Sequence, residues 1–241
     1  MNLLRSEWLK LFTTRTTWAM LGIGLLCEAL FAGLVTGLVS FDDLGDVDEI
    51  ATGMGILMTL MLVLGVLVIT TEFRHGTASS TFLVSPRRWP VLLAKLGACL
   101  LVGLLAGLLY VAVNGGLALP IYSSRGGDLG STQRLVEIYA GVVVSFALLC
   151  AFGLGIGAIV RNQVGAIIAA IAVFFVVSSL PELLPGSIGE YFPAQAVGTL
   201  HGRVEGDGAL TQLSAGLVLA AWAGALVAVG TATILRRDLG E

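Results

Sequence analysis

Charged side chains are scarce in this chain. Aspartate, glutamate, lysine and arginine make up 12% of its 241 residues, while apolar residues make up 56%. A soluble domain carries about twice that share of charge, so these residues are too few to cover a water-exposed surface. Long apolar segments in lipid are the expected alternative. The basic residues form no tail or patch, so no nucleic-acid partner is expected.

Residues typical of catalytic or metal sites are also few. The cysteines, Cys27, Cys99 and Cys150, lie in apolar runs at spacings that match no metal or redox motif. The sequence has neither a GxxxxGK[S/T] phosphate loop nor an HExxH zinc motif. Its only histidines, His75 and His201, are expected on opposite sides of the membrane, and neither is expected to form a serine–histidine pair. We therefore expect no enzymatic activity and no cofactor or metal bound by this chain.

Apolar segments recur along the whole sequence. A helix needs about 20 mostly apolar residues to cross a bilayer core. No segment alternates in the way a membrane barrel requires, so the spans are expected to be helical. We predict an all-α, polytopic membrane protein that forms a single transmembrane domain over 1–241. Its six spans are predicted at about 17–39, 51–71, 91–119, 135–160, 164–180 and 210–235, the fifth being short.

The N-terminal segment 1–16 is predicted to form a separate amphipathic helix in the inner membrane interface. Its apolar face is expected to contain Leu4, Trp8, Leu11 and Phe12. Its polar face is expected to contain Glu7, Lys10 and Thr14. The alternative is a simple extension of the first span. Because 17–39 exceeds the roughly 7–15 apolar residues of a signal peptide, we expect it to be retained.

The basic residues predict the orientation. With the N-terminus inside and six spans, ten of the 13 basic residues fall on the cytoplasmic side: Arg5, Lys10, Arg15, Arg74, Arg87, Arg88, Lys95, Arg161, Arg236 and Arg237. The outer side receives three: Arg125, Arg134 and Arg203. Both termini are therefore expected in the cytoplasm, and the expected location is the bacterial inner membrane.

The cytoplasmic loop 71–90, TEFRHGTASSTFLVSPRRWP, is the most distinctive polar segment. Gly76 is expected to end the second span, Thr77 to cap a short helix through about Phe82, and the Ser85–Pro86 step to end that helix. Lys95 is expected to extend toward the interface. The segment is either a docking helix for a cytoplasmic partner or a helical turn with the basic residues that topology requires.

This loop resembles the corresponding loop of ABC-2-type permeases, the membrane subunits of one class of ABC exporters. The residues that match in order and approximate spacing are Glu72, Arg74, Gly76, Thr77, Ser85, Pro86, Arg87, Arg88 and Lys95. The N-terminal SEWLKLFTTRTTW, the outer Tyr191–Ala194 and the basic exit Arg236–Arg237–Asp238 resemble the family as well. The specific motif is limited to the loop, while the rest of the resemblance is in topology.

The resemblance implies a permease that pairs with an identical or similar second permease chain and two cytoplasmic ATPase subunits. ATP and magnesium would bind the ATPase subunits. The residues expected to contact the ATPase are Glu72, Arg74, His75, Gly76, Thr77, Phe82, Pro86, Arg87 and Arg88. Glu72 would pair with the partner or support Arg74. The expected cargo is a hydrophobic or amphipathic small molecule such as a drug or antibiotic, with a lipid or small peptide as alternatives.

One carboxyl group, that of Glu28, is predicted near the middle of the first span. A charge at that depth costs about 2.5–3.5 kcal/mol on insertion scales. Glu28 therefore either lines a substrate path or is protonated and packed, with Asn114 of the third span as its expected hydrogen-bond partner. A secondary transporter or channel without an ATPase, with Glu28 as its coupling carboxylate, is the alternative function, and a membrane scaffold is a third. Segment 181–209 is either an outer gate or a lid-like loop.

Overall fold

The computed structural model describes residues 3–38, 47–53, 55–76, 88–177, 187–203 and 210–236, and these residues contain helices and no strand. Five of the helical segments are long and apolar enough to cross a membrane: Arg15–Leu38, Val47–Arg74, Trp89–Ser124, Thr132–Val160 and Gln212–Ile234. The prediction of an all-α protein with several apolar helices of membrane-spanning length is confirmed. A sixth apolar helix, Gln163–Val176, is shorter than the other five.

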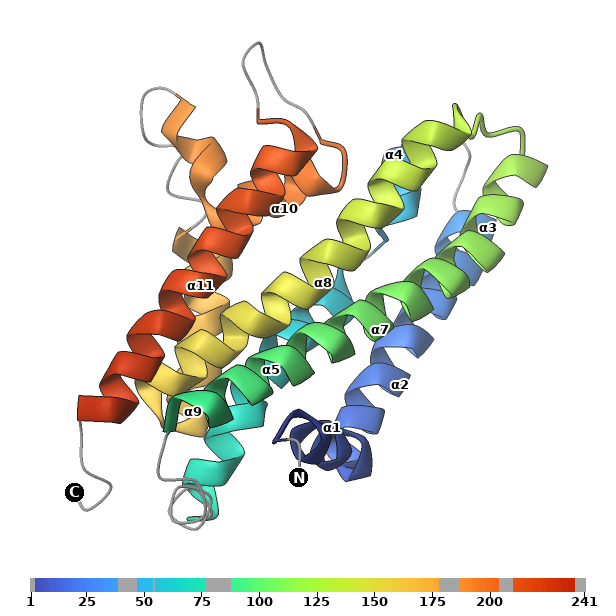
Figure 1. Ribbon diagram of the computed structural model, residues 1–241. Helices are drawn as coiled ribbons and strands as arrows, with labels where there is room; N and C mark the ends of the chain where they lie inside the picture. Colours follow the sequence, from blue (N-terminus) through green and yellow to red (C-terminus); the bar gives the residue numbers. More distant parts are fainter. Residues whose placement is uncertain are drawn as a thin grey trace.

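The first half of the chain forms three of these segments (Figure 1). Helix α1 (Leu3–Thr13) is followed by α2 (Arg15–Leu30), which continues through a π-helical turn η1 (Phe31–Val35) into α3 (Thr36–Leu38). Helices α4 (Val47–Thr52) and α5 (Ile56–Arg74) make up the second segment, and α7 (Arg88–Ser124) is the third. The predicted first span therefore matches closely, while α7 extends beyond both ends of the predicted 91–119.

The second half adds the helix at the centre of the bundle. Helix α8 (Thr132–Val160) packs mainly against α5, α7 and α11 (Gln212–Arg236). In the most apolar 18-residue stretch of this helix, 78% of the residues are buried. In the corresponding stretches of the other four long segments, the buried share is 28–41%. Glycine permits this close packing: a β-carbon at Gly153 would meet the Leu62 carbonyl oxygen of α5, and one at Gly155 would lie 2.6 Å from Cβ of Leu226 in α11.

Shorter elements close the two ends of the bundle. Helix α9 (Gln163–Ile171) continues into the π-helical turn η3 (Ala172–Val176), and the 3-10 turn η5 (Ser187–Tyr191) precedes α10 (Pro193–Leu200). Figure 1 shows α1 lying across one end of the bundle, where α9 begins and α11 ends. Helices α3, α4 and α10 lie at the opposite end. We call these the α1 end and the α10 end.

The second membrane-spanning segment is interrupted between α4 and α5. Gly53 and Gly55 both have positive φ, +56° and +67°, a backbone conformation that glycine adopts without steric cost. Helix α4 therefore ends at Thr52, and α5 begins anew at Ile56. The predicted span 51–71 began at Ala51, near the end of α4, so the separate helix before the interruption was not predicted.

Candidate functional site

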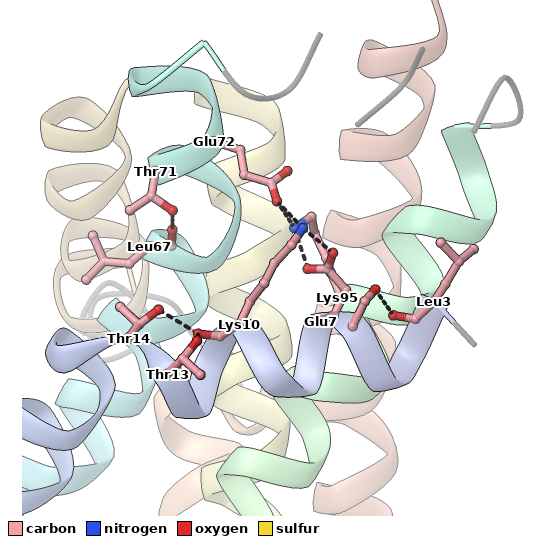
Figure 2. Close-up of polar contacts among 10 residues, drawn as sticks. Leu3, Glu7, Lys10, Thr13, Thr14, Leu67, Thr71, Glu72 and Lys95 are labelled. Atoms are coloured by element: carbon pink, nitrogen blue, oxygen red, sulfur yellow. Dashed lines mark hydrogen bonds and ion pairs between the residues drawn. The ribbon is translucent and has the colours of Figure 1, made fainter. Parts of the chain in front are cut away.

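A cluster of four charged side chains lies at the α1 end of the bundle (Figure 2). Its members, Glu7 and Lys10 of α1, Glu72 of α5 and Lys95 of α7, are called the ion-pair cluster below. The Lys95 Nζ atom lies 2.7 Å from Glu7 Oε2 and 2.6 Å from Glu72 Oε1. The Lys10 Nζ atom lies 2.7 Å from Glu7 Oε1 and 3.2 Å from Glu72 Oε1. Three helices that are separate in sequence are thus joined by four short contacts.

The cluster holds charge inside the protein as well as at its surface. Lys95 and Glu7 are buried, with 2% and 5% of their surfaces exposed, whereas the Lys10 side chain is 51% exposed. Burial acts to raise the pKa of Glu7, but the charge of Lys95 and hydrogen bonds from Lys10 and Lys95 outweigh it and lower that pKa below 4.5. For Lys10, burial acts to lower the pKa, and its contacts with Glu7 and Glu72 raise it above 10.5. Each charge therefore stabilises its neighbours.

Two expectations for these residues were wrong. Glu7 was expected on the outer, polar face of the N-terminal helix, but its carboxylate points into the bundle toward Lys95. Lys95 was expected to extend toward the membrane interface, but it is buried between two carboxylates. In both cases an ion pair across helices replaces the water that an isolated charge would need. The sequence contained the charges but no signal for which of them would pair.

The docking residues predicted from the loop are described only in part. Glu72 pairs with Lys95 and Lys10, and Arg74 Nη1 donates a 3.1 Å hydrogen bond to Gln163 Oε1 of α9. His75 and Gly76 form the exposed turn that ends α5, and Gly76 has a φ of +67°. The backbone of α7 begins at Arg88. Thr77, Phe82, Pro86 and Arg87 lie outside the described residues.

A cleft of about 490 Å³ opens beside the ion-pair cluster. Its lining combines buried apolar side chains, such as Leu11 and Leu64, with exposed polar side chains, such as Thr14 and Arg74. Helices α1, α2, α5, α7 and α9 all contribute to its lining. The cleft therefore lies between α1 and the bundle, next to the point where α5 ends.

A second polar cluster lies within the apolar bundle. Its hydrogen bonds connect uncharged side chains to one carboxyl group, that of Glu28. The predicted hydrogen bond is confirmed: Asn114 Nδ2 donates to Glu28 Oε1 at 2.7 Å, and both residues are buried. The same amide nitrogen donates to the Ile50 carbonyl oxygen at 3.0 Å, and Tyr139 donates to Asn114 Oδ1 at 2.7 Å. We call Glu28, Tyr110, Asn114 and Tyr139 the Glu28 network. Whether it lines a substrate path stays a prediction.

A buried serine–histidine pair contradicts the expectation that no histidine would lie within reach of a serine. Ser145 Oγ of α8 lies 2.9 Å from His201 Nε2, just after α10. Ser145 Oγ also donates to the Val142 carbonyl oxygen at 2.8 Å, so its hydrogen has a backbone acceptor. Burial, and then the charge of Arg203, lower the pKa of His201 to about 4. Both side chains are buried, and the pair ties α10 to α8.

Other chemistry is not visible in the part of the chain that the structure describes. Within residues 3–38, 47–53, 55–76, 88–177, 187–203 and 210–236, no group of three or more histidine, cysteine, aspartate or glutamate side chains could hold a metal ion. No protein-family model and no curated protein sequence matches this chain. The functional assignment therefore depends on the geometry of the site and on the resemblance described above.

Proposed function

We propose that this chain is the membrane permease subunit of an ABC exporter, working with ATPase subunits on other chains. The observation that carries the proposal is the position of Lys95. Its ammonium group joins Glu7 of α1 to Glu72 of α5; Glu72 lies two residues before α5 ends, and Lys95 lies seven residues after α7 begins. A force applied to the segment between α5 and α7 would reach α1, α5 and α7 together, because their ends are held by the same buried contacts.

The proposed arrangement in the membrane has six crossings, with both termini in the cytoplasm and α1 in the inner interface. The basic residues support it: Arg15, Arg74, Arg88 and Arg161 all lie at helix ends on the α1 end. Trp18 supports the interfacial position of α1, because its indole donates a 2.7 Å hydrogen bond to the Phe12 carbonyl oxygen beside the Trp8–Phe12 contact. The fifth crossing would be Gln163–Val176, about 21 Å long as a helix.

The proposed cargo is a hydrophobic or amphipathic small molecule, such as a drug or antibiotic. The cleft beside the ion-pair cluster supports this class, since apolar and polar side chains both line it at the level proposed for the inner interface. An identical or similar second permease chain would complete the central path. The chain itself is proposed to hydrolyse nothing, in keeping with a sequence that has no phosphate loop.

Copurification from the native host tests the assignment. We expect an ATP-binding cassette ATPase to accompany the tagged full-length chain. Arg74→Glu and Gly76→Pro should abolish cargo-stimulated ATP hydrolysis without preventing insertion; at Gly76, φ is +67°, which proline cannot adopt. Arg203→Glu, at an exposed site on the α10 end, is the matched control and should keep wild-type coupling. Wild-type coupling in both α1-end variants would remove the docking hypothesis.

A secondary transporter is the second candidate, and a specific observation favours it. Glu28 lies against the interruption between α4 and α5, and broken helices with buried carboxylates are typical of ion-coupled transporters. The discriminating measurement is transport after ATP depletion. Transport that persists on a proton gradient and stops in Glu28→Gln would replace the ABC assignment, whereas transport that stops on ATP depletion would support it.

A further inference from the structure

The cleft beside the ion-pair cluster has an apolar wall on one helix. Its volume of about 490 Å³ lies in the range of sites that enclose small organic molecules. On α5 the lining includes Leu64, Leu67 and Val68. These residues are three and four positions apart, so they share one face of the helix. Leu11 of α1 adds a further apolar side chain to the lining, so the cleft can take up a hydrocarbon group.

The charged side chains of the lining do not balance. The basic ones are Lys10, Arg74 and Lys95, and the acidic ones are Glu7 and Glu72. With His75 neutral, the described lining therefore carries one net positive charge. Both carboxylates contact ammonium groups within 3.2 Å (Figure 2). Their negative charge is compensated inside the ion-pair cluster, so the positive charge is what remains for a ligand.

The exposed basic groups of the cleft can donate further hydrogen bonds. An ammonium group has three N–H donors and a guanidinium group has five, and neither can accept. Lys10, whose side chain is 51% exposed, contacts Glu7 and Glu72. Arg74 is exposed, and its Nη1 atom donates to the neutral amide of Gln163. A ligand beside these two side chains must therefore supply acceptor oxygens, and an anion supplies them best.

We propose that this cleft binds an anionic amphiphile. Its acidic head group, such as a phosphate, would lie beside Arg74 and Lys10, and its hydrocarbon chain would lie along the apolar face of α5. A guanidinium group suits the head because it can bind two oxygens of one phosphate at once. The role of this ligand as cargo rests on the proposed function, to which the inference adds the sign of the cargo's charge.

Photo-crosslinking of the full-length chain in phosphatidylcholine nanodiscs tests the site without ATPase or ATP. The probe is hexadecyl phosphate with a diazirine on its chain. We expect label in peptides that contain α1 and residues 64–68 of α5, and competition by unlabelled hexadecyl phosphate. Hexadecyltrimethylammonium and inorganic phosphate should compete at least about tenfold more weakly, because the first reverses the head charge and the second lacks the chain.

Matched variants locate the head group. Arg74→Gln should weaken competition by hexadecyl phosphate by about tenfold to 100-fold, the effect of losing hydrogen bonds to a charged group. Thr16→Glu adds a carboxylate at an exposed position of the lining and should weaken it as well. Arg15→Gln is the control, since it removes the same charge from an exposed residue at the same end, outside the cleft lining, and should leave competition unchanged.

Several outcomes would overturn the site. They are label outside the cleft, equal competition by the trimethylammonium compound or by inorganic phosphate, and equal losses in Arg74→Gln and Arg15→Gln. Competition by phosphatidylglycerol placed in the nanodiscs would identify a membrane lipid as the ligand, and its failure to compete would identify a single-chain cargo; both keep the anion site. A chain that binds the probe but copurifies with no ATPase would keep the site and lose the exporter assignment, and the reverse result would do the opposite.

Discussion

The ion-pair cluster and the Glu28 network stabilise their carboxyl groups in different ways. At the α1 end, Glu7 and Glu72 each contact ammonium groups within 3.2 Å. Around Glu28 the Asn114 amide donates to the carboxyl group, and the Tyr110 hydroxyl lies close by. The first arrangement pairs opposite charges, whereas the second places one carboxyl group beside uncharged polar side chains. This difference follows the cost of charge, which is larger within the apolar bundle than at its ends.

The largest expected effect comes from removing the central cation of the ion-pair cluster. Lys95→Met would leave the buried Glu7 carboxylate without the buried one of its two ammonium partners. Breaking a buried ion pair on one side costs about 3–5 kcal/mol of unfolding free energy. Chemical unfolding in detergent micelles measures it. Lys10→Met is the control, since its half-exposed pairs should contribute at most about 1 kcal/mol. Equal losses in the two variants would show that burial of the cluster has no energetic consequence.

Acid should act on the α10 end before it acts on the cluster. The folded pKa of His201 is about 4 and its ordinary value is 6.5, so between these values the unfolded chain binds more protons than the folded protein. The free energy of unfolding should therefore fall by about 3 kcal/mol as pH falls from 6.5 to 4. Thermal unfolding across this range measures the loss, which His201→Gln should largely remove.

The stability of the ion-pair cluster should change in a different pH range from that of His201. The folded pKa of Glu7 is lowered, so its stabilisation is complete above 4.5 and is lost as pH falls through the lower folded value. The raised pKa of Lys10 gives stabilisation that is present below 10.5 and lost only above it. Glu7→Gln should flatten the profile below 4.5 while leaving the His201 window unchanged. A single acid transition that responds to both variants would contradict the separation.

A pair of glycine variants tests the close fit around Glu28. At Gly53→Ala the new methyl group would meet Glu28 and Tyr110 oxygens at 2.6 Å, in addition to the strain of positive φ. At Gly55→Ala the φ strain is similar, but the nearest atom lies 3.8 Å away. We expect losses of about 2–3 kcal/mol at Gly53 and about 1 kcal/mol at Gly55. Similar losses in thermal unfolding would mean that the network accommodates the added carbon.

The smallest effect is expected at the edge of the Glu28 network. Tyr139→Phe removes the hydrogen bond to Asn114 Oδ1 and keeps the ring, so it should cost about 1 kcal/mol of unfolding free energy. Equilibrium unfolding of this variant beside the wild type measures it. A loss as large as that of Lys95→Met would show that the amide of Asn114 is held chiefly by Tyr139.

The proposed function and the fold were predictable to different degrees. Apolar segments identified every long helix, and Glu28 and Asn114 were paired correctly because they are polar residues at compatible depths in the first and third spans. The ion-pair cluster was not predicted. Glu7 was assigned to the exposed face of the N-terminal helix, because the apolar residues Leu4, Trp8 and Phe12 defined the other face as the buried one. The Ser145–His201 contact was also missed, since 56 residues separate its members. Only the packing of the helices brings these groups together, and no local pattern in the sequence indicates it.

By itself the sequence determined the class of the protein and the position of its apolar helices. The length of an apolar run and the placement of basic residues are local properties, and water and lipid act on each segment directly. Only the tertiary structure decided that Lys95 lies between Glu7 and Glu72 and that Glu28 lies against Gly53. Both arrangements depend on which helices pack together, because a buried polar group is stabilised by the partners that packing brings to it.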